Sequence, residues 1–373
     1  MLVAGESSGD QHAANLFLEL KKRQPTIQAI GMGSKKMLDA GVEIHYDSSN
    51  IGVIGVVEVI KRYAEIRRAL NAMKQLLLDQ RPDLLICVDY KEFNFKLATF
   101  AKKNGIKVLF YVSPQVWAWR PGRVVKYGQV IDMMAVIFPF EVPYYDKENV
   151  PVRYVGHPSV DKIHFQRSQQ EDFKAFELNP DQPIIGILPG SRTDEINRML
   201  PVMLQAAELI QKEFSEAQFV LPQADSVTDE LLQNHFQHSS VKVKAIKNQF
   251  HDTLLCCDAV MTVSGTATLE IALVNIPMLV AYKLSALTYF IAQRVVDTKF
   301  IGLPNIIAGK SVVKEFIQAE ANPQNLATEI LHILTDKSYA AEIKQELKVV
   351  QQKVGKGGGS INMAKLVLEM LES

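Results

Sequence analysis

The sequence predicts an α/β protein built from two Rossmann-like parallel-sheet domains that face a cleft. Short β-branched and apolar runs alternate with longer amphipathic segments along all 373 residues, and this alternation is typical of βαβ units. The composition changes near residues 156–158, and the polar stretch 166–172 follows, so we expect two separate series of strands. A chain of this length can bury a core in each of two domains. Because ligands of parallel sheets bind at the carboxyl ends of the strands, we expect the functional site in the cleft.

The first domain is expected over residues 1–160. In the second of its four expected helices, apolar residues recur at helical spacing and predict a stripe that faces the core. The members of this stripe are Val57, Ile60, Ile66, Leu70, Met73 and Leu77. The expected strands are 2–4, 28–31, 84–88, 108–112, 134–137 and 152–155, and the expected helices are 9–22, 57–79, 93–103 and 123–131.

The second domain is expected over residues 161–335. A third segment, 336–373, is expected to form C-terminal helices that pack back toward the first domain. Within it, the glycine-rich stretch 355–360 breaks the chain before a last helix at 361–371. The expected strands of the second domain are 184–188, 219–221, 241–245, 260–263 and 278–281.

The composition is that of an ordinary globular protein. Apolar residues make up 47% of the chain, and 41 Lys and Arg residues balance 41 Asp and Glu residues. This balance argues against a nucleic-acid binder that works through bulk positive charge. No apolar run reaches the roughly 18 residues that a membrane-spanning helix needs, and no signal peptide is recognisable. The chain begins almost inside its first strand, which leaves open whether residues are missing before Met1.

The sequence predicts neither a metal site nor a cofactor. Its three cysteines, two of them adjacent at Cys256 and Cys257, show neither a disulfide framework nor a ligand spacing, which favours a reducing compartment. No H-E-x-x-H or D-x-D motif is present either, so we expect no catalytic metal.

The most informative motif follows the expected strand 260–263. A buried strand that turns through Ser-Gly-Thr into a helix leaves free backbone N–H groups at the start of the helix, where phosphate or pyrophosphate binds. Glu270 follows about one helical turn later, where its carboxylate can reach a ribose hydroxyl. The residues of the turn itself are Ser264, Gly265, Thr266 and Thr268.

A second turn of this kind follows the strand 184–188 and carries Arg192. A guanidinium in a loop before a helix can hold a diphosphate through two hydrogen bonds; an exposed salt bridge is the alternative. Two anion-binding turns in one half of the chain indicate a nucleotide diphosphate. The later loop 302–309, with Asn305 between Pro and Gly residues, predicts on its own only a turn.

Asp89 ends the strand 84–88 and is the candidate general base. A carboxylate at the carboxyl end of a central strand points into the cleft, where a base belongs. The alternative is the N-cap of the following helix, which Asp also favours. Position alone does not decide between the two.

The turn 5–10 follows the first strand, opens a helix and matches the G-x-S-x-G pattern of serine hydrolases. Asp89 and His157 even follow in the order of a Ser-Asp-His triad. Against a hydrolase, the serine stands after the first strand, and no His-Gly-Gly oxyanion segment is present. Two other interpretations are a plain turn with serine caps and a loop that borders a sugar in the cleft.

Two further stretches carry weaker signals. Residues 111–120 hold both tryptophans of the chain, whose faces suit a sugar or acyl pocket, with core packing as the alternative. The apolar stretch 51–57 precedes a basic helix, a pattern that suits an anionic membrane surface but also an ordinary amphipathic helix. The basic residues of that helix are Lys61, Arg62, Arg67, Arg68 and Lys74.

Together these stretches resemble the lipid-A-disaccharide synthase family, bacterial glycosyltransferases with the B-type fold of two Rossmann domains. The string Ser-Pro-Gln-Val-Trp-Ala-Trp-Arg at 113–120 is the most specific of them, whereas the Gly-rich turns alone are not specific. The family's Asp-x-Pro-Asp/Glu-Phe-Asn motif is matched by Asp89, Phe93 and Asn94, but its proline is absent here. The matching stretches span nearly the whole chain in the family's order, at 4–10, 112–120, 155–157, 188–192, 264–270 and 303–305.

The resemblance implies an inverting, single-displacement glycosyltransferase that uses no metal and no cofactor. It implies transfer of a diacylglucosamine unit from UDP-2,3-diacylglucosamine to 2,3-diacylglucosamine 1-phosphate (lipid X), which gives lipid A disaccharide 1-phosphate and UDP. Asp89 is then the base, and Glu6, Ser8, Trp117 and Asn305 belong to the substrate site. Related enzymes work at the cytoplasmic face of the inner membrane of Gram-negative bacteria, so an anionic membrane surface is an implied partner. A second copy of the chain, in a homodimer, is the one protein partner considered.

Two other classes stay open at this point. One is another UDP-N-acetylglucosamine enzyme of the same fold, either an epimerase or a transferase with a different lipid acceptor, which should lack the Trp-Ala-Trp-Arg string. The other is a non-catalytic nucleotide-sugar-binding scaffold, which would need no carboxylate at position 89. An oxidoreductase is disfavoured because no G-x-G-x-x-G opens either domain.

Overall fold

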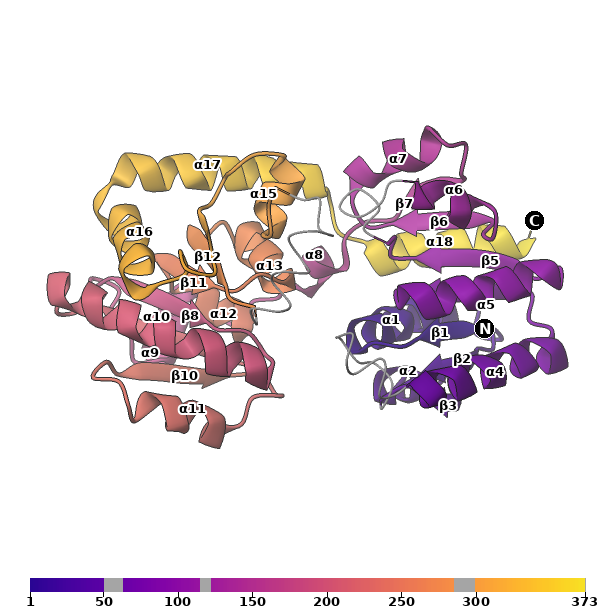
Figure 1. Ribbon diagram of the computed structural model, residues 1–373, viewed down its shortest axis with the longest axis horizontal. Helices are drawn as coiled ribbons and strands as arrows, with labels where there is room; N and C mark the ends of the chain where they lie inside the picture. The colour runs from indigo at the N-terminus through magenta and orange to yellow at the C-terminus, as the bar shows by residue number, and fades with distance from the viewer. Residues whose placement is uncertain (50–62, 115–121, 285–298, 373) are drawn as a thin grey trace. The chain divides into compact units, whose positions relative to one another are not determined.

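A computed structural model describes residues 1–49, 63–114, 122–284 and 299–372 of the chain (Figure 1). The chain divides into two compact units, of which unit 1 comprises Met1–Asp161 with Gly355–Ser373 and unit 2 comprises Lys162–Val354. The expected C-terminal segment 336–373 is therefore split between them. Helix α17 (Lys337–Val354) belongs to unit 2, and only the last helix, α18 (Gly359–Glu372), belongs to unit 1.

Unit 1 is built on a seven-stranded parallel sheet with the strand order β3-β2-β1-β4-β5-β6-β7 (Figure 1). Its strands are β1 (Leu2–Ala4), β2 (Ile30–Gly33), β3 (Glu43–Asp47), β4 (Leu84–Val88), β5 (Lys107–Tyr111), β6 (Met133–Val136) and β7 (Val152–Tyr154). Besides α18, its helices are α1 (Ser7–Arg23), α2 (Lys35–Asp39), α4 (Tyr63–Gln80), α5 (Lys91–Lys103), α6 (Arg123–Gly128), the 3₁₀ turn η1 (Pro139–Glu141), α7 (Val142–Asp146) and α8 (Pro158–Lys162).

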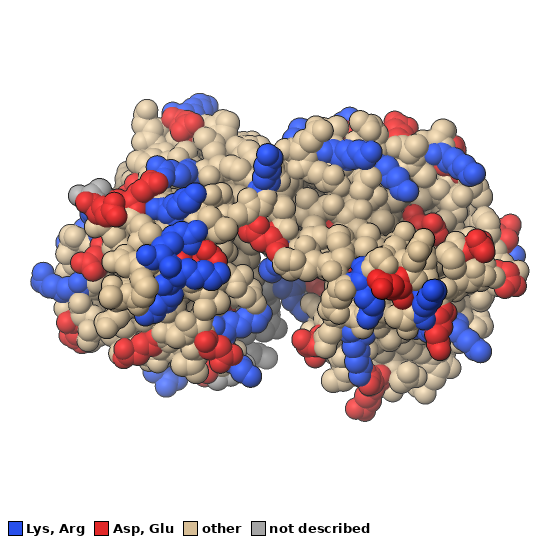
Figure 2. Space-filling view, turned by 180° about the vertical axis from the view of Figure 1, so that it is seen from behind, with Lys and Arg blue, Asp and Glu red and all other residues tan. Residues whose placement is uncertain are grey.

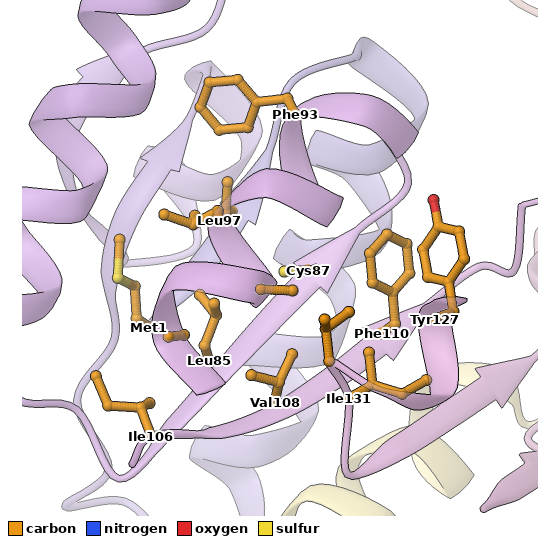
Figure 3. Close-up of a cluster of buried hydrophobic side chains, with 14 of the residues drawn as sticks. Met1, Leu85, Cys87, Phe93, Leu97, Ile106, Val108, Phe110, Tyr127 and Ile131 are labelled. Carbon is orange, nitrogen blue, oxygen red and sulfur yellow. The ribbon is translucent and has the colours of Figure 1, made fainter. Parts of the chain in front are cut away.

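The central strand β4 shows why this sequence forms a sheet covered on both faces. All five of its residues are buried, which is typical of an inner strand of a parallel sheet. Alternate residues of a strand point to opposite faces. Leu85 and Cys87 therefore join one core cluster, to which α5 contributes Phe93 and Leu97 (Figure 3). The other β4 residues join a second cluster, which includes residues of α1 and α18.

The expected core stripe of α4 is confirmed where the helix is described. Met73 and Leu77 are buried in the first cluster, and Ile66 and Leu70 pack against it. The first two members of the stripe lie outside the described residues. Burial of the stripe leaves the polar face of α4 on the surface, where Arg67 is exposed.

Unit 2 is built on a six-stranded parallel sheet with the order β10-β9-β8-β11-β12-β13. Its strands are β8 (Ile184–Leu188), β9 (Gln218–Gln223), β10 (Val243–Lys247), β11 (Ala259–Thr262), β12 (Met278–Tyr282) and β13 (Glu315–Ile317). Besides α17, its helices are α9 (Gln169–Ala175), α10 (Thr193–Glu213), α11 (Asp229–Phe236), α12 (Phe250–Leu255), α13 (Thr266–Val274), α15 (Leu303–Ala308) and α16 (Pro323–Thr335). The expected α/β class with two Rossmann-like parallel sheets is confirmed.

Both sheets reverse their strand order at an inner position. In unit 1 the chain winds outward in opposite directions from β1 and β4, and in unit 2 it does so from β8 and β11. The loops at the carboxyl ends of such a pair diverge to opposite faces of the sheet and leave a crevice, where ligands of open α/β sheets bind. The fold therefore marks one ligand-binding edge in each unit.

The surface gives few functional signals of its own. Figure 2 shows basic and acidic side chains intermingled over the face that it presents, in keeping with equal numbers of the two. Among the helices of the described ranges, none is both long and apolar enough to cross a bilayer.

Candidate active site

In unit 1, the turns after β1 and β4 lie against each other at the ligand-binding edge. The two strands pair through Ala4 and Val88. A side chain at Gly9 would place its Cβ 3.3 Å from the Val88 carbonyl oxygen and 3.8 Å from the Asp89 Cβ. Glycine at this position thus permits the close approach of the two turns. Ser8, the neighbour of Gly9, is exposed at the same edge.

The Tyr90 ring connects the two turns. A Cβ at Gly5 would fall 2.1 Å from the ring, so only a glycine lets the ring lie against this turn. Burial raises the pKa of Tyr90, and the nearby Glu6 carboxylate raises it further. The structure therefore brings Glu6 and Asp89, two of the residues expected in the site, to the same edge of the sheet.

Asp89 lies partly buried directly after β4. Burial raises the pKa of its carboxyl group, while the Lys91 ammonium and a hydrogen bond from the Tyr90 N–H act in the opposite direction. Its backbone is left-handed, with φ of 48°, and its N–H donates to the Tyr111 carbonyl oxygen at 3.0 Å. The N-cap of α5 is Tyr90, so the alternative of Asp89 as the cap of that helix is not supported.

Asn94 holds the end of β4 in place, a role that the sequence reasoning missed. Its side-chain amide is fully buried and donates to the carbonyl oxygens of Asp89, at 2.8 Å, and Val88, at 3.2 Å. The same amide reaches the Val3 carbonyl oxygen of β1 at 3.4 Å. These bonds restrain the left-handed backbone from which the Asp89 carboxylate projects. Its place in the family motif was the only sequence signal for this residue.

The Ser-Asp-His arrangement of a hydrolase is not assembled. His157 follows β7, which is separated from β1 by β4, β5 and β6. The imidazole is buried, its Nδ1 accepts the Ser159 N–H at 3.1 Å, and the ring packs on Phe138 with a centroid distance of 4.7 Å. His157 is therefore part of the packing beyond β7.

In unit 2, the turn into α13 presents an open helix start. Gly265 is the N-cap of α13, its backbone is extended, and a Cβ there would meet no atom within 4 Å. Gly265 and Thr266 are exposed. Thr268 is fully buried, and its hydroxyl donates to the Gly265 carbonyl oxygen at 2.7 Å. The Ser264 hydroxyl donates to the Ile301 carbonyl oxygen at 2.7 Å, so these two hydroxyls shape the turn.

Arg192 lies on the neighbouring turn. Strands β8 and β11 pair directly, and the Val263 N–H donates to the Leu188 carbonyl oxygen, so both turns leave the same edge of the sheet. The Arg192 guanidinium pairs with Glu195 at 3.1 Å, while 59% of the Arg192 side chain remains exposed. A Cβ at Gly190, where φ is 103°, would fall 2.5 Å from the Glu195 carboxylate, so glycine makes room for this pair.

Glu270 has a partner that the sequence reasoning missed. Its carboxylate is 3.1 Å from Nε2 of His251 on α12, and the two side chains are 16% and 13% exposed. A lone histidine carries no sequence signal for such a contact, because the packing of α12 against α13 creates it. His251 thus fixes the Glu270 carboxylate one turn into α13, and part of the Glu270 side chain stays exposed to solvent.

Asn305 is buried and fully engaged. Its side-chain oxygen accepts the N–H groups of Val312 and Val313, and its amide donates to the Val313 carbonyl oxygen. The amide also donates to the Glu315 carboxylate at 2.7 Å. Asn305 therefore stabilises the backbone at residues 312–313 through hydrogen bonds. Glu315, the partner in its fourth hydrogen bond, is a residue that no sequence motif indicated.

Two expected features lie outside the described residues. These are Trp117 with its aromatic string, and the apolar stretch 51–57 with the first basic residues of the following helix. In the part of the chain that is described, no cluster of His, Cys, Asp and Glu side chains could hold a metal ion.

Comparison with known proteins places these features in a family. The family model of lipid-A-disaccharide synthetase matches residues 1–369. The lipid-A-disaccharide synthase of Geobacter sulfurreducens is 44% identical over 371 residues, which cover 100% of this chain and 97% of that protein. The enzyme of the same name from Coxiella burnetii is 39% identical over 373 residues, covering 100% of this chain and 98% of that protein.

Solved structures share the fold at low identity. A putative UDP-N-acetylglucosamine 2-epimerase from Listeria monocytogenes matches with a TM-score of 0.66 at 14% identity, over 100% of this chain and 95% of that one. MurG of Acinetobacter baumannii matches with a TM-score of 0.58 at 14% identity, over 99% and 98% of the two chains. Such distant likeness shows the fold alone, so the epimerase alternative gains no support against the whole-length family match. The chain belongs to the lipid-A-disaccharide synthase family and is a glycosyltransferase of lipid A biosynthesis.

Proposed function

We propose that this glycosyltransferase condenses UDP-2,3-diacylglucosamine with 2,3-diacylglucosamine 1-phosphate to form lipid A disaccharide 1-phosphate and UDP. Membership of the family supports this choice of substrates. The observation that carries the proposal is the pair of turns after the adjoining strands β8 and β11, one with an open helix start and the other with an exposed guanidinium. A partly buried carboxylate at the carboxyl edge of the unit 1 sheet supports it further.

On the donor side, the diphosphate of the UDP-sugar binds at the start of α13. The backbone N–H groups of the exposed residues Gly265 and Thr266 donate hydrogen bonds to its phosphate oxygens, and the α13 dipole favours negative charge at that end. The exposed Arg192 guanidinium leaves Glu195 and pairs with the phosphates. Glu270, held by His251, binds the ribose hydroxyls.

On the acceptor side, Asp89 removes the proton of the primary hydroxyl of the acceptor sugar. The oxygen attacks the anomeric carbon of the donor as the bond from that carbon to the phosphate oxygen breaks, and UDP departs with the electron pair. Attack from the opposite face inverts the anomeric centre. A positioned general base typically contributes about 10²–10⁴-fold. The donors at α13 and Arg192 stabilise the charge on the departing UDP, where one such donor is typically worth about 10²–10³-fold.

The direct test is incubation with both lipid substrates, followed by mass spectrometry of the products. We expect the disaccharide phosphate and an equal amount of UDP, and loss of both in Asp89→Asn with the fold retained. Release of UDP without disaccharide would contradict the proposed acceptor. Near-normal turnover of Asp89→Asn would contradict the role of Asp89 as base.

We further propose that the protein binds the anionic surface of the inner membrane through the polar face of α4. The exposed Arg67 and Arg68 support this, and 58% of Tyr63 at the start of the helix is exposed. Basic and aromatic side chains are favoured at anionic interfaces. Flotation with anionic liposomes at low salt should carry the wild type and carry less of an Arg67→Gln/Arg68→Gln variant. Failure of the wild type to float would contradict the proposal.

A further inference from the structure

Glu315 accepts hydrogen bonds from the segment 301–305, which is itself bonded to the start of α13. It lies on the edge strand β13, where it is paired in register with Val280 of β12. One carboxylate oxygen accepts the Ile301 N–H at 2.8 Å. The other accepts the Gly302 N–H at 2.9 Å and the Asn305 side-chain amide at 2.7 Å. A single side chain thereby holds three donors from one short segment.

That segment is in turn bonded to the anion-binding turn. The Ile301 carbonyl oxygen accepts the Ser264 hydroxyl at 2.7 Å, and the Leu303 N–H donates to the Thr268 hydroxyl at 3.3 Å. Thr268 also donates to the Gly265 carbonyl oxygen. Hydrogen bonds on both sides of the 301–303 backbone therefore link Glu315 to the N-cap turn of α13.

The packing around Glu315 leaves little room for rearrangement. A Cβ at Gly302 would lie 3.1 Å from the Glu315 carboxylate and 3.2 Å from the Val280 side chain, which is a tight fit on both sides. Burial raises the pKa of Glu315, and its three hydrogen-bond donors oppose that rise. A buried carboxylate is costly unless it is well hydrogen-bonded, and here the bonds converge on one loop.

We infer that Glu315 is a positioning residue of the donor site, which orders the 301–305 segment and through it the backbone N–H groups that bind the UDP diphosphate. This inference rests on the proposed function. Glu315 touches no substrate; it acts through Ser264 and Thr268. This positioning role also explains why Asn305, a motif residue, is buried. The Asn305 amide donates to the Glu315 carboxylate and so belongs to the same hydrogen-bond network.

The test is UDP binding by calorimetry in Glu315→Gln, with Glu329→Gln as the matched control. Glutamine has nearly the same shape, but its NH₂ group faces at least one of the three donors, so the segment must shift. Glu329 is also a buried glutamate of unit 2, where it is held by Lys314 and Tyr339, each at 2.6 Å. The control thus removes a buried charge away from the 301–305 segment.

We expect Glu315→Gln to weaken UDP binding about ten-fold or more, because buried donors lose a charged acceptor. In Glu315→Gln, the KM for the lipid acceptor should stay within about two-fold of wild type. The UDP affinity of Glu329→Gln should also stay within about two-fold of wild type, as expected for independent sites. Glu315→Asp, which keeps the charge, should restore part of the affinity. A folded Glu315→Gln that binds UDP like the wild type would overturn this inference alone. A wild-type protein that does not bind UDP would overturn the proposed function, and this inference with it.

Discussion

Asp10 is the last residue of the Gly5-Glu6-Ser7-Ser8-Gly9-Asp10 motif, and we predict that its mutation damages stability and not chemistry. Its carboxylate is 3% exposed and accepts three backbone N–H groups at the start of α2. These come from Ser34 at 2.6 Å, Lys36 at 3.1 Å and Met37 at 3.4 Å. The side chain of Ser34, the N-cap of α2, makes no capping bond, so Asp10 takes that role.

The expected cost follows from these bonds. A hydrogen bond to a charged group is worth about 1.5–3 kcal/mol. The bond from Met37 is long and should contribute less. The N–H of the exposed Lys36 can bond to water in a variant, which also reduces the loss. We therefore expect Asp10→Ala to lower the free energy of unfolding by about 2–4 kcal/mol, and Asp10→Asn, which keeps one acceptor oxygen, to lower it less.

The assay is urea denaturation followed by tryptophan fluorescence. Both tryptophans, at positions 117 and 119, belong to the same Met1–Asp161 stretch of the sequence as Asp10. Asp39→Ala is the control, because Asp39 is an exposed carboxylate at the other end of α2. It should change stability by less than about 0.5 kcal/mol. KM values of folded Asp10→Ala should stay near those of wild type. Equal stability of the two variants, or an inactive Asp10→Ala of normal stability, would refute the reasoning.

Three further predictions concern the site itself. The activity should fall toward low pH as Asp89 takes up a proton, at a higher pH than for an ordinary aspartate because burial raises its pKa. Lys91→Met removes a charge that lowers this pKa and should move the acid limb of kcat/KM to higher pH, whereas Lys96→Met, on the exposed face of α5, should not. Gly265→Ala should leave the melting temperature unchanged, since its Cβ meets no atom within 4 Å, yet weaken UDP binding in calorimetry by covering the open helix start; unaltered affinity would count against that site. His251→Leu frees Glu270 and should raise the KM for the UDP-sugar several-fold with kcat unchanged, and a fall in kcat alone would contradict a ribose-binding role.

Inner strands were predictable because their signal is local. β4 and β8 are continuous apolar runs buried on both faces, and their bounds match the expected 84–88 and 184–188. Of the four edge strands, β3 and β13 were missed, whereas β7 and β10 overlap the expected 152–155 and 241–245. β3 alternates exposed and half-buried residues, and β13 has three half-buried residues, so neither shows an apolar run.

The residues of the candidate site likewise divide into those with a local sequence signal and those without one. Motif residues on turns after inner strands, such as Asp89 and Arg192, could be located because the turn follows directly from the strand. Asn94, His251 and Glu315 could not be, because their roles depend on contacts between segments far apart in sequence. No local pattern marks a residue whose partners are supplied by another loop.

The most direct measurement is a crystal structure of the protein with UDP. We predict phosphate oxygens within hydrogen-bonding distance of the backbone N–H groups at the start of α13 and of the Arg192 guanidinium, with the ribose at Glu270. Phosphates bound away from both turns would contradict the account of the donor site.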